Sequence, residues 1–409
     1  MEEIIFATLN SQDEQLLSEH RGWLKDIWVN EAKGHPSAFS EGSSLLGILR
    51  AFIKCNIVKK DETFKIHAYG VVFGDELIKS TEDFSWVVVQ EGSQRQWAIQ
   101  SSKTAAYIFP LALMAEKFAN DQEIDVYEMV EEFSFRLKYP DADPDAKLLE
   151  IKALATSLSV PGIRLLPSDK PSRSHLGGEP HLPPEILWPQ RNGNKLGFLA
   201  RISLAELQQI YPISWLPTDG ALLFFYDIEE QPWGYEPQDR GSWAVLHVPD
   251  LQAPLAASSS DVNDGCAPHI AIGFHAIQTL PSTYRPDIEA QAFTYREDKA
   301  YWSVVGGYDD ETPNHQIDGF AAVIQEPHME LMCQLISHGI DYLEHNHHED
   351  PRAIALEEGS SEWRLLLQLD YDERFGDIWG DGGTFFFWVQ AGESAAGRFD
   401  NCWLIKQCG

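Results

Sequence analysis

The chain has 409 residues, of which 44 % are hydrophobic and 11 % aromatic, enough apolar side chain for a sizeable core and against global disorder. Asp and Glu total 63 against 31 Lys and Arg, a formal net charge of −32, so nucleic-acid phosphates and anionic membrane surfaces would repel it. No apolar run reaches the roughly 20 residues of a membrane span, and signal-peptide features are lacking. The five scattered cysteines, an odd count without metal-ligand spacing, favour a reducing, cytoplasmic location.

The first 140 residues predict a compact α+β domain. Apolar residues at helical spacing indicate helices, which begin at Ser11 and near Gly42 and cover Leu111–Asn120 and Val126–Leu137. Alternating or β-branched runs indicate strands at Phe64–Tyr69, Phe84–Val89 and Trp97–Gln100.

Residues 141–159 are expected to form a linker and a helix, because Asp141–Asp145 is short, acidic and contains a proline. Residues 160–409 then change to short, aromatic, strand-like runs. The predicted strands are Leu196–Ile202, Gly220–Asp227, Trp243–Val248, Tyr301–Val305, Leu365–Leu369, Thr384–Val389 and Cys402–Ile405. Helices are expected only at Leu204–Ile210 and Pro327–His338.

One internal echo lies in this second region. Leu196–Ile202 followed by Gly220–Asp227 resembles Leu365–Leu369 followed by Gly383–Trp388. In both copies an apolar strand precedes a connection, a glycine and a nearly all-aromatic strand. This similarity indicates either an internal duplication or the similar composition that buried strands share. The expected fold class is α+β: a small N-terminal α+β domain, then a larger β-rich, mostly antiparallel domain with a candidate internal repeat.

The second region resembles the YwqG-like family of uncharacterised bacterial proteins. The resemblance rests on motifs in order over residues 160–409, among them Gly177–Pro183, Leu196–Ile202, Gln231–Gly234, His315–Phe320 and Trp379–Gly383. The N-terminal region more weakly resembles a second uncharacterised bacterial domain, through Val71–Asp75, Trp86–Val88 and Ile108–Pro110. Neither resemblance implies a reaction; some YwqG-like members neighbour secreted toxins, which implies an immunity role.

Motifs for catalysis and metal binding are lacking, so no cofactor and no metal are expected. There is no nucleophile elbow, zinc-protease motif, phosphate loop or dinucleotide fingerprint. The run His345–Asp350 offers suitable ligand types but is read as a solvated loop. Asp370–Gly376 begins like a calcium loop, yet Arg374 and Phe375 stand where a ligand and a glycine belong.

We therefore expect a binding protein: an acidic immunity protein that occludes the active site of a toxin or effector, plausibly a basic nuclease. Between Lys299 and Arg352 lie ten acids and no Lys or Arg, an imbalance that would steer a basic partner. The expected partner-binding residues combine acids with two rings in a Pro-flanked loop: Trp233, Tyr235, Asp309, Asp310, Glu311, Asp318, Asp377 and Asp381.

The alternative is an enzyme or small-ligand receptor. Its pocket would lie between the two β-repeats and would use residues such as His175, Arg201, His315 and Asp381. No oligomeric state is predicted.

Overall fold

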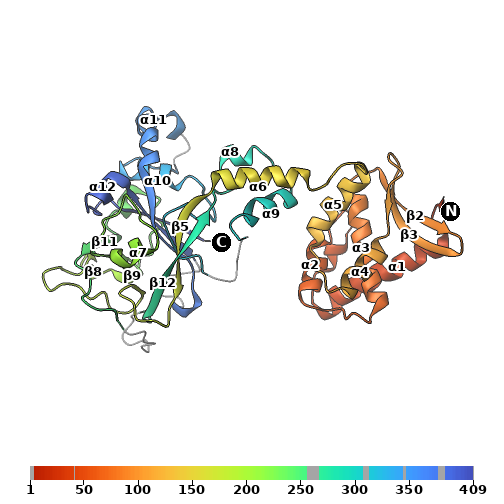
Figure 1. Cartoon of the computed structure of the whole chain (residues 1–409), viewed down its shortest axis with the longest axis horizontal. Coiled ribbons are helices and arrows are strands. Elements are labelled where there is room, and N and C mark those ends of the chain that lie inside the picture. Colours follow the sequence, from red (N-terminus) through yellow and green to blue (C-terminus); the bar gives the residue numbers. More distant parts are fainter. Residues whose placement is uncertain are drawn as a thin grey trace. The chain divides into compact units, whose positions relative to one another are not determined.

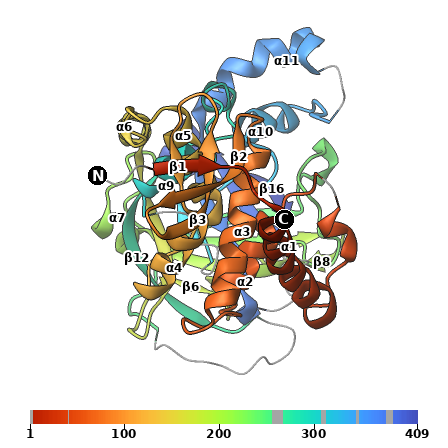
Figure 2. The same cartoon turned by 90° about the vertical axis from the view of Figure 1, so that its right-hand side faces the viewer.

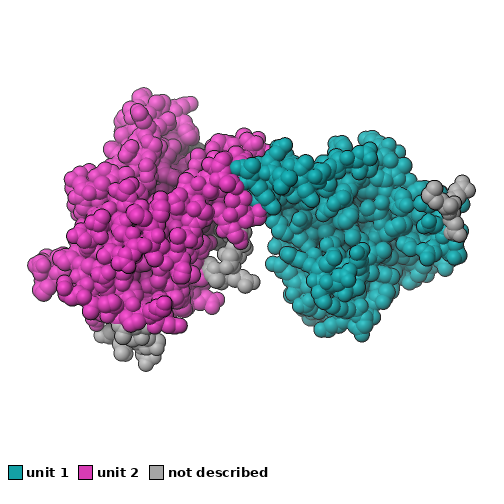
Figure 3. Space-filling model, viewed as in Figure 1, with its two compact units in different colours: residues 1–153, 293–301 teal, residues 154–292, 302–409 magenta. Residues whose placement is uncertain are grey.

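The structure is a computed structural model that describes residues 4–40, 42–255, 267–306, 313–343, 347–375 and 383–408. The chain divides into two compact units (Figures 1 and 3): Met1–Ala153 with Phe293–Tyr301, and Leu154–Ala292 with Trp302–Gly409. It passes from the first unit to the second within helix α6 (Ala146–Leu158). Each unit has a hydrophobic core of its own.

The N-terminal unit combines an antiparallel sheet with several helices (Figure 2). The strands, in sheet order, are β1 (Ile4–Ala7), β2 (Phe84–Glu91), β3 (Gln94–Ser101) and β4 (Tyr107–Ile108). The helices in its first 153 residues include α1 (Ser11–Asp26), α2 (Leu46–Lys54), α3 (Thr63–Lys79), α4 (Pro110–Ala119) and α5 (Val126–Lys138). The predicted strands Phe84–Val89 and Trp97–Gln100 are confirmed and pair as β2 and β3, and the predicted helices from Ser11 and over Val126–Leu137 are confirmed as well.

Helix α3 is the central element of this unit, and it corrects one prediction. Phe64–Tyr69 was expected to be a strand but lies in the first turns of α3. The alternation there is only six residues long, whereas Ile66, Tyr69, Phe73 and Leu77 are buried at intervals of three or four. Gly70 lets α4 approach, because a Cβ atom there would lie 2.7 Å from the Cα of Leu111.

A segment from late in the sequence also belongs to the N-terminal unit. Helix α9 (Tyr295–Ser303) packs beside α5, where the carboxylate of Glu131 accepts the backbone N–H groups of Tyr295 and Arg296 at 2.7 and 2.8 Å. The predicted strand Tyr301–Val305 is therefore wrong. Tyr301 is buried as the inward-facing residue of a helix, which gives the segment its apolar character.

The C-terminal unit is built on one large antiparallel sheet. Among the described residues ten strands follow the order β11-β10-β9-β6-β12-β5-β13-β14-β15-β16. Their bounds are β5 (Val160–Pro167), β6 (His175–Leu176), β9 (Gly197–Ser203), β10 (Ala221–Tyr226), β11 (Trp243–Val248), β12 (Ile270–Thr279), β13 (Gln316–Ile317), β14 (Trp363–Leu369), β15 (Gly383–Gln390) and β16 (Trp403–Cys408). A separate hairpin joins β7 (Gln190–Arg191) to β8 (Asn194–Lys195).

The strand order has two-fold symmetry. Two successive sets of five strands occupy equivalent positions on either side of the sheet centre: β5, β6, β9, β10 and β11, and then β12, β13, β14, β15 and β16. The first strand of each set is exchanged, so that β12 lies next to β6 and β5 lies next to β13. The register of the strand pairs repeats too. The pair His175–Arg201 in the first half is equivalent to Gln316–Gln368 in the second. The pair Phe225–Phe198 is equivalent to Trp388–Leu365. These pairings match the two copies of the internal echo.

The two halves of the sheet face each other across one core. Phe224 of β10 meets Phe387 of β15 edge to face, with ring centroids 5.1 Å apart. The loop after β10 is fastened to the far edge strand, since the backbone N–H of Lys406 donates to the Trp233 carbonyl oxygen at 2.9 Å. The sheet therefore curls until its two ends are bridged.

Short helices fill the connections of the C-terminal unit. They include α7 (Leu204–Ile210), α8 (Pro286–Glu289), α10 (Met329–Ser337), α11 (Pro351–Leu356) and α12 (Ala391–Ala395). The predicted helices Leu204–Ile210 and Pro327–His338 correspond to α7 and α10. The α+β fold class is confirmed, and within the described residues no helix combines the length and apolarity needed to cross a bilayer.

Candidate functional site

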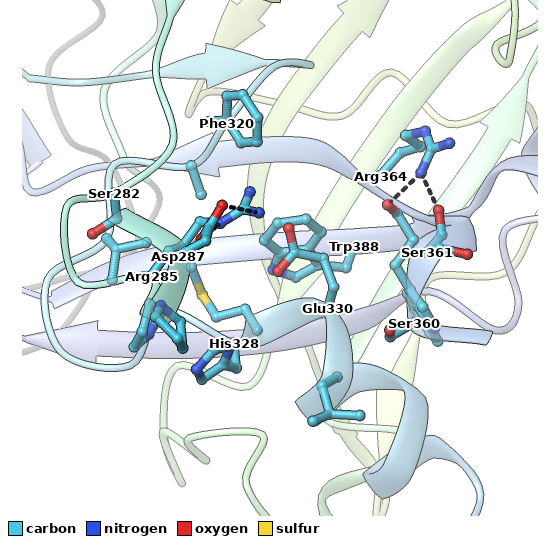
Figure 4. A pocket seen from close by; sticks show the side chains of 17 residues that line it. Ser282, Arg285, Asp287, Phe320, His328, Glu330, Ser360, Ser361, Arg364 and Trp388 are labelled. Carbon is cyan, nitrogen blue, oxygen red and sulfur yellow. Dashed lines mark hydrogen bonds and ion pairs between the residues drawn. The ribbon is translucent and has the colours of Figure 1, made fainter. Parts of the chain in front are cut away.

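A cavity of about 450 Å³ opens on the second half of the C-terminal sheet. Its walls come from the segment after β12, the segment after β13, the start of α10, and strands β14 and β15 (Figure 4). The volume lies in the range of small-molecule sites. The central lining residues are Arg285, Phe320, His328, Glu330, Arg364 and Trp388.

Two indole rings of this cavity differ in their hydrogen bonding. Trp363 donates its Nε1–H to the Gln334 side-chain oxygen at 2.8 Å. The Nε1 of Trp388 is buried and has no hydrogen-bond partner in the described part of the chain, although the residue is only 2 % exposed. An unpaired buried donor costs about 1–3 kcal/mol, so an acceptor that enters the cavity would gain this bond.

Two guanidinium groups lie on opposite sides of the cavity (Figure 4). Arg285 contacts Asp287 at 3.3 Å, and both side chains are largely exposed. Arg364 donates to two carbonyl oxygens, those of Ser361 at 2.7 Å and Trp363 at 2.9 Å, and forms no ion pair within the described residues. Its charge is therefore not neutralised by a carboxylate contact.

Glu330, on the first turn of α10, lies between these groups. Burial raises the pKa of its carboxyl group, while its own backbone amide and the charges of Arg285, His328 and Arg364 act in the opposite direction. The shift remains upward, so the group keeps its proton at a higher pH than a free glutamate. A protonated Glu330 could donate a hydrogen bond to a ligand oxygen.

The symmetry-related position in the first half of the sheet is filled. There Phe225 takes the place of Trp388, and Trp188 packs on it edge to face with centroids 5.6 Å apart. The Nε1–H of Trp188 donates to the Leu196 carbonyl oxygen at 2.8 Å, so that indole is satisfied. The same backbone arrangement thus supports a packed side chain in one half and an open cavity in the other.

A serine and a cysteine of this region differ in their relation to the cavity. Ser361 lines it, but its hydroxyl donates to the Glu358 carbonyl oxygen at 2.9 Å rather than to a base. Cys333 does not line it, and burial raises the pKa of that thiol far above its usual value. Across the described ranges no three His, Cys, Asp or Glu side chains are placed to hold one metal ion.

The sequence-predicted rings lie on the loop fastened to β16, away from the cavity. Trp233 is 40 % exposed, with the Lys406 ammonium 5.3 Å from its ring centroid. Tyr235 packs against the core, and burial raises the pKa of its hydroxyl to about 12. Gly234 permits the close approach of this loop, because at its φ of +79° a Cβ atom would lie 1.8 Å from the Leu404 carbonyl oxygen.

The predicted acids are only partly covered by the structure. Asp318 is half-buried at the end of β13, where burial raises its pKa although Trp215 hydrogen-bonds to the carboxyl group. Asp309, Asp310, Glu311, Asp377 and Asp381 lie outside the described residues, as does His345.

The residues of the alternative prediction, His175, Arg201 and His315, do not line the cavity. His315 donates to Asp372 at 3.2 Å and accepts from the Asp370 backbone at 3.1 Å, a closed structural network. His175 donates from Nδ1 to the Gly177 carbonyl oxygen, and its buried Nε2 has no partner in the described ranges. Its pKa falls to about 3, chiefly because of burial and the nearby His269.

Sequence reasoning missed the cavity residues. The sequence predicts the aromatic strand that contains Trp388, and the signal for a cavity is the one ring that differs between the two copies of the echo, Trp388 against Phe225. Arg285 and Glu330 carry no motif, because they reach the cavity only through long-range strand pairing.

Comparisons with known proteins identify no function. No curated protein matches the chain. A crystal structure of a protein from Bacteroides thetaiotaomicron is 13 % identical in sequence, with a TM-score of 0.29. The match covers 32 % of this chain and 48 % of that one, and so weak a similarity identifies neither a shared fold nor a function.

Two family profiles match, one in each half of the sequence. The profile "Domain of unknown function (DUF3806)" matches residues 46–130 of the N-terminal unit. The profile "Domain of unknown function (DUF1963)" matches residues 174–408, a range that includes the sheet from β6 to β16 and every residue of the cavity. Since that match covers more than half of the chain, the protein belongs to the DUF1963 family.

Proposed function

We propose that the protein is a receptor for a small organic anion, which binds in the cavity of the C-terminal unit. The observation that carries this proposal is the buried, unpaired Nε1–H of Trp388 in a cavity that also holds the unneutralised Arg364. This develops the small-ligand alternative of the sequence analysis, with a different set of residues.

Each polar group has a distinct role in this proposal. Arg364 binds the anionic group of the ligand, because a guanidinium pairs with carboxylate or phosphate in a bidentate manner. Trp388 donates to a second ligand oxygen, and Phe320 provides an apolar wall. Glu330 donates while protonated and repels the anion once ionised, so binding weakens as pH rises through its raised pKa.

The test is a binding screen with a matched pair of tryptophan variants. Saturation-transfer NMR with a mixture of small aromatic carboxylates and phosphate monoesters identifies a binder, and calorimetry gives its affinity. Arg364→Gln and Trp388→Phe should each weaken binding about tenfold, the effect of losing one hydrogen bond to a charged ligand. Trp188→Phe, a control in the other half of the sheet, should leave the affinity unchanged.

Two outcomes would overturn the proposal. One is that no member of the mixture binds at millimolar concentration. The other is that Trp188→Phe and Trp388→Phe change the affinity equally, since the open cavity would then be irrelevant.

A second candidate, the immunity protein expected from the sequence and the YwqG-like resemblance, is favoured by the exposed ring of Trp233. The ring is large, 40 % exposed and held on a loop whose backbone is bonded to β16. Such preorganised aromatic side chains are typical anchors of protein interfaces. The proposed partner is a basic toxin, steered by the acids that include Asp309, Asp310, Asp377 and Asp381.

Coexpression with a basic toxin domain encoded beside the gene tests this second candidate. Trp233→Ala should abolish protection of the cells, whereas replacing Asp309, Asp310, Asp377 and Asp381 by Lys should slow association and leave the fold intact. Full protection by both variants would contradict the immunity role.

A further inference from the structure

The N-terminal unit contains a cavity of its own, of about 500 Å³. It lies between the end of α2 with the segment after it, the middle of α3, and the end of α4 with the segment after it. All of its lining residues fall within 46–130, the range of the DUF3806 match. The aromatic lining residues are Phe52, Tyr69 and Phe118.

Three lysines line this cavity, although the chain as a whole carries a net charge of −32. Lys60 is paired with Asp121. Lys117 donates to the Glu123 carbonyl oxygen at 3.5 Å, and in the part of the chain that the structure describes neither Lys117 nor Lys59 forms an ion pair. Glu123 also lines the cavity, so Lys59 and Lys117 leave it with an excess of one positive charge for an anion.

The cavity also holds an unpaired hydroxyl group. Tyr69 is 0 % exposed, and its Oη has no hydrogen-bond partner among the described residues. Burial raises the pKa of this hydroxyl, so it stays neutral and keeps its proton to donate. A buried hydroxyl without a partner costs about 1–3 kcal/mol, which a ligand oxygen would recover.

Apolar side chains form one part of the remaining wall, and Asn56, Gln122 and Glu123 form the other. The Phe118 ring lies 6.0 Å from the Tyr69 ring, centroid to centroid, and Val58 and Phe52 belong to the same core. Apolar walls with cationic side chains fit a molecule with a ring or short chain at one end and a negative charge at the other.

We propose that this cavity is a second binding site, for an amphipathic organic anion. The apolar body of the ligand lies between Phe52 and Phe118, its anionic group binds Lys59 and Lys117, and an oxygen accepts the Tyr69 hydroxyl. This site is separate from the cavity of the C-terminal unit and does not depend on the function proposed for it.

The test uses 1-naphthalenesulfonate as the charged probe and 1-naphthalenemethanol as its uncharged analogue, with the full-length protein and calorimetry. The sulfonate should bind this site, and the variant Lys59→Gln/Lys117→Gln should bind it at least tenfold more weakly. The control Lys25→Gln/Lys103→Gln removes two charges elsewhere in the same unit and should leave the affinity within about twofold. The uncharged analogue should bind both double variants alike.

The variant Tyr69→Phe tests the role of the hydroxyl group in binding without destabilising the fold. The ring is retained and an unpaired buried group is removed, so the variant should unfold at the same temperature as the wild type or above it. Its affinity for the sulfonate should fall severalfold. Arg364→Gln, in the other cavity, should have no effect on this affinity.

Three results would overturn the proposal: no binding of the sulfonate at millimolar concentration, equal affinities in the two lysine double variants, or a loss of binding in Arg364→Gln as large as in Lys59→Gln/Lys117→Gln. The last result would place the probe in the C-terminal cavity instead.

Discussion

Single buried polar atoms mark the two proposed binding sites more clearly than any sequence motif does. Trp388 and Tyr69 both lie within apolar cores, yet each has a donor without a partner among the described residues, and each lines a cavity. Unpaired donors are not a general consequence of the fold, because Trp188 and Trp363 donate their indole N–H groups to acceptors within the chain. Residue identity alone could not separate these four aromatic side chains.

Glu330→Gln tests the electrostatics of the C-terminal cavity without a ligand. Because the folded-state pKa of Glu330 is raised, the folded protein holds the proton to higher pH than the unfolded chain, and stability falls as pH rises from about 4.5 through that pKa. Glutamine mimics the protonated form, so the variant should melt above the wild type at pH 7.5. Near pH 4 the two melting temperatures should converge. A variant that melts below the wild type at pH 7.5 would show that the ionised carboxylate is favourably paired.

His175 gives the opposite dependence on pH. Its pKa is about 3 in the folded protein against 6.5 for a free histidine, so the unfolded chain binds the extra proton and stability falls as pH drops below about 6.5. At pH 5 this loss is on the order of 2 kcal/mol. In His175→Gln, which copies the symmetry-related Gln316, calorimetric melting between pH 7.5 and 5 should show a smaller decrease than in the wild type. An equal decrease would mean that other groups dominate acid unfolding.

At the scale of elements, the sequence predicted the outer strands of the C-terminal sheet and missed its centre. Trp243–Val248 is predicted residue for residue as β11, because its burial and turn signals are local. The central strands β5 and β12 were not predicted: Pro161, Gly162 and Gly273 interrupt their pattern, and they pair mainly with strands remote in sequence. The echo between the two halves was visible, but the exchange of β5 and β12 was not.

The packing of the first half of the sheet predicts the effect of removing the Trp188 side chain. Trp188→Ala would uncover Phe225 and Phe198 and leave a void where the other half has its cavity. Loss of a packed tryptophan typically destabilises a protein by about 3 kcal/mol, and urea unfolding should show this decrease for the C-terminal unit. Trp388→Ala should destabilise less, because it also removes a buried indole N–H that has no partner among the described residues. Equal losses in the two variants would contradict this difference in hydrogen bonding.

At the scale of the whole chain, the sequence predicted a boundary near Asp141–Asp145 but could not show which later segment returns to the N-terminal unit. Helix α9 is short and polar, and its placement depends on side chains of α5 and of the predicted linker. Lys299 pairs with Asp125 and Glu128 at 3.1 and 2.9 Å, and Arg296 pairs with Asp145 at 2.6 Å. No local pattern encodes contacts that span some 150 residues.

This arrangement predicts that a cut in the linker does not separate the two halves of the chain. A protease site placed between Asp141 and Asp143 should be cleaved, because the segment is exposed. The fragments should nevertheless co-elute in gel filtration at physiological salt, because α9 belongs to the second fragment and docks on α5 of the first, where Glu131 accepts two backbone N–H groups from it.

The variant Glu131→Ala/Lys299→Ala removes that acceptor and the pairs with Asp125 and Glu128, so its cleaved fragments should elute separately. Glu132→Ala is the matched control on the same helix: Glu132 pairs with Arg136 within α5 and should leave the fragments together. If the wild-type fragments separate after cleavage, α9 does not hold them together, and the predicted domain boundary at the linker is then also the physical one. If the double variant stays together, contacts other than those of Glu131 and Lys299 join the halves.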